Sequence, residues 1–153
     1  MLLAVALVAM DVRSDLSELK STGQVDDRGA VPVGWPDLER PHEGVGRVSP
    51  QRVRMIGYMM DGYQPSRDGA AVDMFILLPE AGQFLHPAHR IPNQMVEIRP
   101  SHPVVFHYRE LVWATGILNR TMNSHRGDMA AYAMVAAEVN PATERDIGKW
   151  FRP

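Results

Sequence analysis

The sequence predicts a mainly β protein whose central domain is a five-stranded barrel of the oligonucleotide/oligosaccharide-binding type (OB-like), with short terminal helices and a Pro/Gly-rich N-terminal arm. Two observations support this prediction. Five runs of strand-forming residues, bounded by Gly, Pro, Asn or Asp, follow one another without a long helix between them. The chain also has 12 Gly and 12 Pro in 153 residues, which favours turns and short strands. An all-β sandwich is the alternative architecture.

The clearest strand pattern lies in the fourth of these runs. Val112, Ala114 and Leu118 share one face, whereas Trp113 and Ile117 share the other. Such alternation is typical of a strand with two different environments. The five predicted strands cover residues 52–60, 71–78, 94–99, 111–118 and 130–139.

Two kinds of residue inside these runs indicate how the barrel is built. Gly57 and Gly116 lie within strands, where glycine often marks a bulge or a barrel corner. The methionines can fill irregular spaces in a core, and this interpretation is favoured over copper or haem ligation. These methionines are Met55, Met59, Met60, Met74 and Met95.

The chain divides into four predicted segments. They are residues 1–24, an apolar anchor or docking segment plus a short helix; residues 25–49, an extended arm; residues 50–140, the barrel; and residues 141–153, a C-terminal docking tail. The first helix is expected at residues 14–23, where Ser14 can cap the first turn and Gly23 can end the last. A second helix is expected at residues 141–149.

Composition and charge restrict the functional classes. The net charge of −2 and the pI of about 6.3 argue against a nucleic-acid-binding protein. The lack of cysteine excludes disulfides, thiolate nucleophiles and cysteine-based zinc sites. The sequence contains no Gly-x-Ser-x-Gly elbow, phosphate-binding loop or supported carboxylate pair. We therefore predict that the protein is not an enzyme.

The first ten residues are all apolar. A bilayer-spanning helix needs about 20 such residues, and a signal peptide needs a cationic start. Three interpretations stay open. The run is the end of an anchor or export signal that starts upstream of Met1, an apolar plug for a partner or the membrane interface, or a first core element.

An ordered series of short motifs runs through the central domain. They are Ile56-Gly57-Tyr58-Met59-Met60, Phe75-Ile76-Leu77-Leu78-Pro79, Gly82-Gln83-Phe84-Leu85-His86, Ile91-Pro92-Asn93-Gln94, Val112-Trp113-Ala114-Thr115-Gly116-Ile117-Leu118 and Ala131-Tyr132-Ala133-Met134. In this order and spacing, the chain resembles the bacterial domain-of-unknown-function family numbered 3299. The resemblance implies an exported or membrane-attached protein with an OB-like barrel, and it implies no established activity.

The chain departs from the resembled family within one motif. Phe84 stands where the family has a cysteine, whereas the histidine of that motif is kept as His86. A Cys–His pair can bind a soft metal or carry out redox chemistry, and a Phe–His pair cannot. A family site that depended on that cysteine would be lost in this chain.

Histidines are concentrated between residues 86 and 107 and form the candidate metal site. They are His86, His89, His102 and His107. Imidazole suits zinc or copper, so a small metal-binding or metal-delivery domain is the alternative function. Structural zinc sites usually contain cysteine, however, and prolines interrupt this segment. The competing interpretation is loop histidines that bond to backbone or solvent, and the main hypothesis requires no cofactor.

The main hypothesis is a non-enzymatic accessory or structural subunit of a bacterial membrane complex. It would be periplasmic or membrane-associated, and its termini would bind protein partners, since buried apolar and aromatic side chains contribute most binding energy. The expected contact residues are Met1, Leu2, Leu3, Val5, Leu7, Trp35, Trp150 and Phe151. Residues 1–10 could also contact a membrane, and no nucleic-acid partner is expected. The competing interpretation is that both arms wrap around their own barrel.

Overall fold

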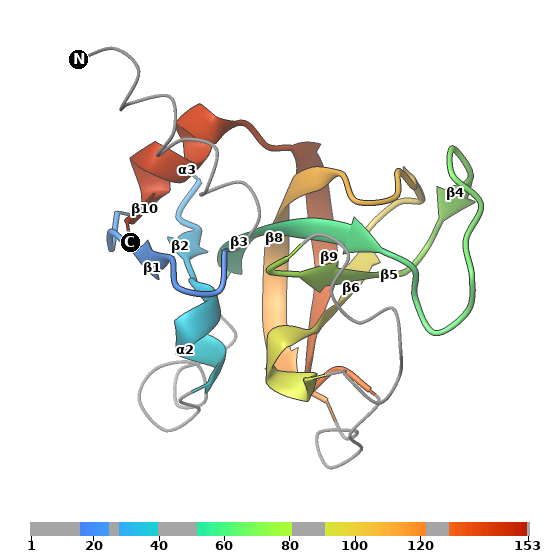
Figure 1. Ribbon diagram of the computed structural model, residues 1–153, viewed down its shortest axis with the longest axis horizontal. Coiled ribbons are helices and arrows are strands. Elements are labelled where there is room, and N and C mark those ends of the chain that lie inside the picture. The colour runs from blue at the N-terminus through green and yellow to red at the C-terminus, as the bar shows by residue number, and fades with distance from the viewer. Residues whose placement is uncertain (1–15, 25–27, 40–51, 81–90, 122–128, 153) are drawn as a thin grey trace.

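The computed structural model describes residues 16–24, 28–39, 52–80, 91–121 and 129–152. The predictions for Met1, Leu2, Leu3, Val5, Leu7, His86 and His89 lie outside this part of the chain. Within it, strands form a barrel at the centre of the molecule (Figure 1). The paired segments Lys20–Ser21 and Phe151–Arg152 lie toward one end of the long axis, and a strand-bearing loop occupies the other.

Five strands form the barrel, and each lies in or close to a predicted run. They are β3 (Arg52–Met60), β5 (Phe75–Leu78), β6 (Val96–Pro100), β8 (Leu111–Arg120) and β9 (Tyr132–Pro141). The hydrogen-bonded order is β3-β5-β6-β9-β8, and β8 pairs with β3 to close the ring. Neighbouring strands are antiparallel except β6 and β9, which run parallel. The predicted OB-like barrel is confirmed.

Two glycines allow the barrel strands to approach one another closely. A Cβ atom on Gly57 would lie 2.6 Å from Cγ of Leu77 and 2.8 Å from the carbonyl oxygen of Leu78. A Cβ atom on Gly116 would lie 2.6 Å from the carbonyl oxygen of Val135, and the β8–β9 register shifts at this position. Gly116 therefore marks a bulge, as predicted, and Gly57 marks a close approach of β3 and β5.

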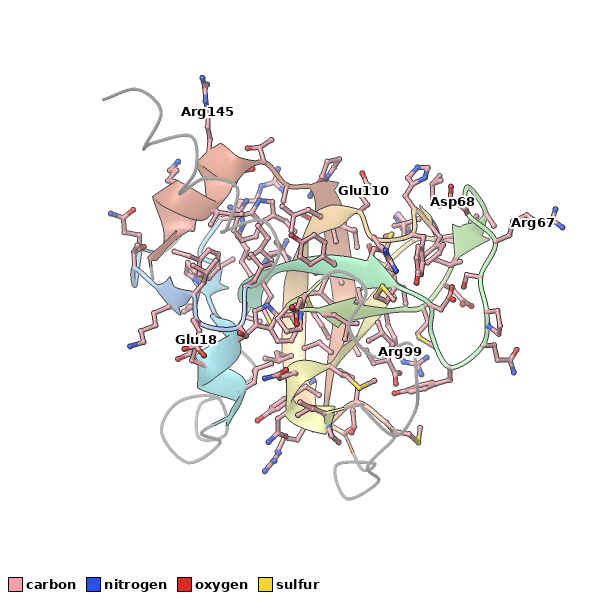
Figure 2. The ribbon with its side chains drawn as sticks, viewed as in Figure 1. Glu18, Arg67, Asp68, Arg99, Glu110 and Arg145 are labelled. Carbon is pink, nitrogen blue, oxygen red and sulfur yellow. The ribbon has the colours of Figure 1, made fainter. Side chains whose placement is uncertain are left out.

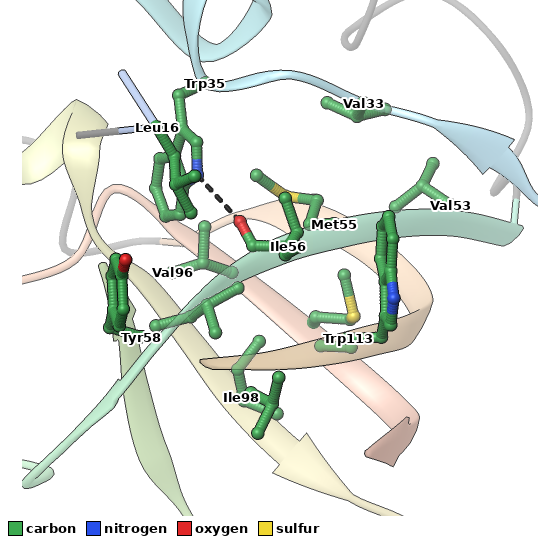
Figure 3. Close-up of a cluster of buried hydrophobic side chains, with 14 of the residues drawn as sticks. Leu16, Val33, Trp35, Val53, Met55, Ile56, Tyr58, Val96, Ile98 and Trp113 are labelled. Atoms are coloured by element: carbon green, nitrogen blue, oxygen red, sulfur yellow. Dashed lines mark hydrogen bonds between the residues drawn. The ribbon is translucent and has the colours of Figure 1, made fainter. Parts of the chain in front are cut away.

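The main core fills the barrel and continues between β3 and the N-terminal segment (Figure 3). Alternate residues of β5 and β6 are fully buried in it, as expected of strand faces that point into a barrel. These residues are Phe75, Leu77, Val96 and Ile98. The indole N–H of Trp35 donates a hydrogen bond to the carbonyl oxygen of Ile56 at 2.9 Å. Leu16 is fully buried in the same cluster.

The N-terminal arm is built into the fold. β2 (Val31–Pro32) pairs in parallel with β3, and α2 (Trp35–Glu39) follows it. The prediction of an extended arm over residues 25–49 is therefore wrong at α2. A segment this short has little intrinsic tendency to form a helix. The helix forms here because it buries Trp35 and Leu38 against the barrel.

The two ends of the described chain pair with each other. β1 (Lys20–Ser21) is antiparallel to β10 (Phe151–Arg152), which directly follows α3 (Glu144–Trp150). The backbone N–H of Thr22 also donates to the carbonyl oxygen of Trp150 at 3.0 Å. We refer to β1, α3 and β10 together as the clasp.

Aromatic side chains attach the clasp to the barrel. Phe151 stacks on Trp113 with ring centroids 5.6 Å apart, and the guanidinium of Arg54 lies 4.1 Å from the Trp113 ring and 5.2 Å from the Trp150 ring. Trp150 and Phe151 are 7% and 3% exposed, and Trp35 is 2% exposed. These three residues are therefore core residues of the chain itself and not the predicted partner contacts, because the barrel offers them an apolar surface nearby.

The helices of the described chain are short. The helix predicted at residues 14–23 is wrong for its described part, which forms a turn and β1, because β10 supplies backbone partners that so short an isolated helix lacks. The helix predicted at residues 141–149 is confirmed as α3, which begins later because β9 continues to Pro141. η2 (Pro92–Gln94) is a single 3₁₀ turn before β6. No helix among the described residues is long and apolar enough to cross a bilayer.

Candidate functional site

Residues 61–74 and 101–110 together form a projection that we name the finger. In it, β4 (Ala71–Val72) pairs with β7 (Val104–Val105) as a separate two-stranded ribbon. The ribbon lies at the end of the molecule opposite the clasp (Figure 1). The predicted strand at residues 71–78 is thus divided, because the chain bends at Asp73 between the ribbon and the barrel.

The finger is fixed to the barrel by its own backbone. Phe106 is fully buried in the main core, and its N–H donates to the carbonyl oxygen of Ala70 at 2.8 Å. The N–H of Gly69, whose φ of +82° requires glycine, donates back to Phe106 at 2.7 Å. The N–H of Tyr108 donates to Oδ1 of Asp68 at 2.9 Å. The segment around residue 108 therefore has a defined conformation.

A strained residue lies next to this segment. The N–H of Glu110 donates to the carbonyl oxygen of His107 at 3.0 Å, which closes a turn with Arg109 at φ +64°. Glycine usually occupies such a position, and a residue with a Cβ atom costs about 1–2 kcal/mol there. Arg109 is the one non-glycine residue with positive φ in the described chain. Its N–H donates to the carbonyl oxygen of Met59 at 2.8 Å, which holds the conformation.

The strained turn presents a mixed apolar and cationic surface. Val105 is 53% exposed and Tyr108 is 39% exposed. Arg109 is also exposed, and its guanidinium lies 5.0 Å from the centroid of the Tyr108 ring. We refer to these three residues as the finger tip. An exposed tyrosine beside an arginine and an apolar residue is a typical composition for a protein interface.

A polar network binds the start of the finger to the barrel. Glu97 on β6 is only 5% exposed, and its Oε2 accepts a hydrogen bond from the hydroxyl of Tyr63 at 3.0 Å. Its Oε1 accepts from Nε of Arg99 at 2.6 Å, and Figure 2 labels Arg99 on this side of the molecule. The Tyr63 oxygen in turn accepts from the N–H of Ala130 at 3.3 Å. The buried carboxylate is thus paired, as burial of a charge requires.

The network lies beside a second apolar cluster that includes two residues of β5 and one of β3. Strand β5 and its neighbour β6, which carries Glu97, are the second and third strands of the barrel. Tyr63 and Met74 of the finger pack against this cluster. Its buried members are Met60, Ile76, Leu78, Met95 and Ala130. In OB-type barrels the face of these two strands commonly binds ligands. In this chain, finger side chains pack against that region.

Burial is the main reason why the pKa of Tyr63 is raised to about 12. The hydrogen bond from the N–H of Ala130 lowers this pKa, whereas the hydrogen bond to Glu97 and the charge of Glu97 raise it further. The folded protein therefore favours the neutral phenol. This contribution to stability is complete below the ordinary tyrosine pKa of 10.0 and is lost as the pH rises through about 12.

We expect the free energy of unfolding of the wild type to fall more steeply between pH 10.0 and about pH 12 than that of the Tyr63→Phe variant. Urea titrations across the interval measure it, and parallel curves for the two proteins would contradict the assignment.

The predicted metal site is only partly within the described residues. His102 and His107 lie on either side of β7, and both are exposed. His102 Nδ1 lies 2.7 Å from the carbonyl oxygen of Ser101, which matches the interpretation of a loop histidine bonded to backbone. His107 Nδ1 lies 3.9 Å from Asp68, an acid that the sequence reasoning did not place nearby. The described residues contain no cluster of three or more metal-ligating His, Asp or Glu side chains, and the four-histidine site stays a prediction.

Sequence reasoning did not identify the finger tip or the Tyr63 network as sites. One signal was present, because Glu97 is an acid within an otherwise apolar run from Met95 to Ile98. An acid at such a position needs a partner when the strand is buried on both faces. For Arg109, no local signal predicts a positive φ, because the turn lacks a glycine.

The fold and these sites together define a class: a closed OB-like barrel that carries a projecting finger and in which β1 pairs with β10. The chain belongs to DUF3299, a family of proteins of unknown function, whose profile matches residues 33–141. That span includes the whole barrel and the finger, whereas β1, α3 and β10 lie outside it.

One solved structure is similar to this chain. The crystal structure of a DUF3299 family protein from Pseudomonas aeruginosa PAO1 is 21% identical, with a TM-score of 0.48. The similarity covers 62% of this chain and 63% of that chain, which is less than two thirds of its length. No curated protein matches the chain.

Proposed function

We propose that the protein is a non-enzymatic accessory subunit that binds a protein partner through the finger tip. The observation that carries the proposal is the exposure of Val105, Tyr108 and Arg109 on a backbone that is hydrogen-bonded to the barrel. Tyrosine and arginine are enriched among residues that dominate binding energy, and a preformed surface lowers the entropic cost of association.

The strain at Arg109 supports the same proposal. Residues in sparsely populated backbone conformations cluster at binding sites, where the surrounding structure holds them. Glycine at this position would remove the strain, yet the chain carries a long cationic side chain there. A role of the Arg109 side chain in binding would explain why arginine and not glycine occupies this position.

Two further observations bear on the kind of partner. Stacking platforms for bases in OB-type barrels lie on the second and third strands. Tyr63 and Met74 pack against a cluster that includes β5 residues, and Tyr63 donates a hydrogen bond to Glu97 of β6, which favours a protein over a nucleic acid. For localisation we retain the proposal of an exported, periplasmic or membrane-associated protein of a bacterial membrane complex. It rests on the apolar residues 1–10.

A photo-cross-linking amino acid introduced at position 108 tests the proposal in cells that make the full-length chain. We expect it to capture one defined protein, whereas the same group at Val135, a 38% exposed position on β9, does not. With the captured partner purified, Tyr108→Ala should weaken binding by about 30-fold, the effect of a hot-spot residue, and Val135→Ala should not. Equal capture from both positions, or equal affinities of the two variants, would contradict the proposal.

Arg109→Gly separates binding from folding in the same assay. Because glycine tolerates the positive φ, its free energy of unfolding should be unchanged or raised by about 1 kcal/mol. Partner binding should nevertheless decrease. A variant that is more stable and binds as well as the wild type would show that Arg109 has no part in the interface.

A further inference from the structure

We infer that Met59 is the positioning residue of the finger tip: its sulfur atom accepts the N–H of His107 and thereby holds Tyr108 and Arg109 in the conformation that binds the partner. The inference rests on the proposed function, because it names the residue that keeps that same surface preformed. It also gives one of the methionines a role other than filling the core.

The turn at Arg109 is part of a β-bulge. The N–H of Arg109 donates to the carbonyl oxygen of Met59, and the N–H of Met59 donates to the carbonyl oxygen of Glu110, both at 2.8 Å. One residue of β3 thus faces two consecutive residues, and the first of the two has a φ of +64°. In this type of bulge, glycine normally occupies the first position.

A second bulge of the same type in the finger serves as an internal comparison. There, the N–H of Gly69 donates to the carbonyl oxygen of Phe106 at 2.7 Å, and the N–H of Phe106 donates to that of Ala70 at 2.8 Å. Its first residue is a glycine with a φ of +82°. The chain therefore follows the usual pattern at Gly69 and departs from it at Arg109. The departure disfavours the turn at Arg109 by about 5- to 30-fold, which calls for a compensating contact.

The side chain of Met59 supplies that contact. Its sulfur lies 3.3 Å from the backbone nitrogen of His107, two residues before Arg109, and accepts the N–H. Met59 is 1% exposed, so its sulfur is shielded from water. Thioether sulfur is a weak acceptor, yet a shielded donor that loses its partner destabilises the conformation that buries it. Phe106, which faces the glycine bulge, has no side-chain acceptor.

Met59 contacts the turn through three of its atoms. Its nitrogen, carbonyl oxygen and sulfur pair with Glu110, Arg109 and His107, respectively. Met59 itself is fixed, because it is buried in the main core and pairs with Leu77 of β5. The finger tip is therefore positioned from the core of the barrel, and Figure 2 labels Glu110 where the turn joins β8.

Amide hydrogen exchange in the full-length Met59→Leu variant, followed residue by residue by NMR, tests the inference. Leucine nearly keeps the volume of methionine and cannot accept a hydrogen bond. We expect the amides of His107 and Arg109 to lose about tenfold in protection, while the amides of β8 keep theirs.

The matched control is Met55→Leu. Met55 is also on β3 and is fully buried, but it pairs with Ala114 of β8 and not with the turn (Figure 3). This variant should protect the amides of His107 and Arg109 as the wild type does.

The double variant M59L/R109G distinguishes positioning from a general effect on the barrel. Glycine removes the strain that the sulfur contact offsets, so protection of the His107 amide should return to within about threefold of the wild type. A loss of protection that arose from damage to the core would not be restored by glycine in the turn.

Partner binding gives the final measurement. With the partner captured at position 108, Met59→Leu should raise the dissociation constant about threefold, because only the fraction of molecules with a correctly held finger tip binds. Met55→Leu should leave it unchanged.

Three results would overturn the inference: unchanged His107 protection in Met59→Leu, an equal loss in Met55→Leu, or lost protection with undiminished partner affinity. They would leave the proposed function intact, because capture at position 108 is measured in a chain that keeps Met59. Failure to capture any partner, together with the expected exchange results, would contradict the proposed function and still establish that Met59 positions the turn.

Discussion

Replacing Phe151 with alanine is expected to lower the free energy of unfolding by about 3–5 kcal/mol, the usual cost of truncating a buried aromatic residue. Phe151 is 3% exposed and stacks on Trp113 although it lies almost at the end of the chain. Its loss would remove apolar contact from Trp113 and weaken the pairing of β10 with β1. Since single domains are stable by only about 5–15 kcal/mol, the tail is a large part of the total.

Urea unfolding followed by far-ultraviolet circular dichroism measures this effect without relying on tryptophan fluorescence. Val135→Ala is the matched control, because this β9 side chain is 38% exposed and its truncation should change stability by about 0.5 kcal/mol or less. A Phe151→Ala protein with the wild-type urea midpoint would show that the tail is not part of the core and would restore the docking role predicted from sequence.

Gly116→Ala is expected to destabilise the protein by about 3 kcal/mol, at the upper end of the usual cost of overpacking. The added Cβ atom would lie 2.6 Å from the Val135 carbonyl oxygen and 3.0 Å from the Cα atom of Ala137. Both are backbone atoms of β9, so they cannot move aside without disturbing the β8–β9 pairing. Thermal or chemical denaturation of the purified variant measures the loss.

Gly148→Ala provides a control of opposite sign. Gly148 is exposed on α3, and no heavy atom lies within 4 Å of its added Cβ position. Alanine should therefore stabilise the helix by about 0.5–1 kcal/mol. A lower free energy of unfolding for Gly116→Ala and a higher one for Gly148→Ala would confirm that Gly116 is required for the close packing of β8 and β9. Similar changes in both variants would contradict the barrel geometry at the bulge.

The barrel strands were predictable because their signals are local. The run at residues 52–60 matches β3 (Arg52–Met60), and the runs at residues 111–118 and 130–139 lie within about two residues of β8 and β9. Each run is long, rich in strand-forming residues and bounded by turn residues, so its conformation depends little on its partner. The order of the strands in the barrel was seen only in the structure, because no single run indicates its neighbours.

The short pairings were not predictable from local sequence. β1 and β10 have two residues each, and their pairing joins Lys20 to Arg152 across almost the whole chain. Two residues carry no periodic pattern, and an isolated pairing of this length is unstable in water. The same reason applies to the ribbon of β4 and β7 in the finger.

The candidate sites depended on tertiary contacts in the same way. Tyr63 and Glu97 are separated by 34 residues, and the finger tip depends on hydrogen bonds from residues 106–109 to Asp68, Ala70 and Met59. The aromatic residues Trp150 and Phe151 were predicted to contact a protein partner, whereas the surface on which they pack is their own barrel. Composition indicates that such side chains will be buried, and it does not indicate on which molecule.

The amino-acid sequence by itself determined the class of fold, the barrel strands, the positions of Gly57 and Gly116, and the absence of cysteine chemistry. Those properties follow from short-range periodicity and residue type, which act within a few residues of one another. The tertiary structure decided where the termini dock, which backbone is strained at Arg109, and how Glu97 is neutralised. These outcomes depend on contacts between segments far apart in the chain, whose free energies exist only once the barrel has brought the segments together.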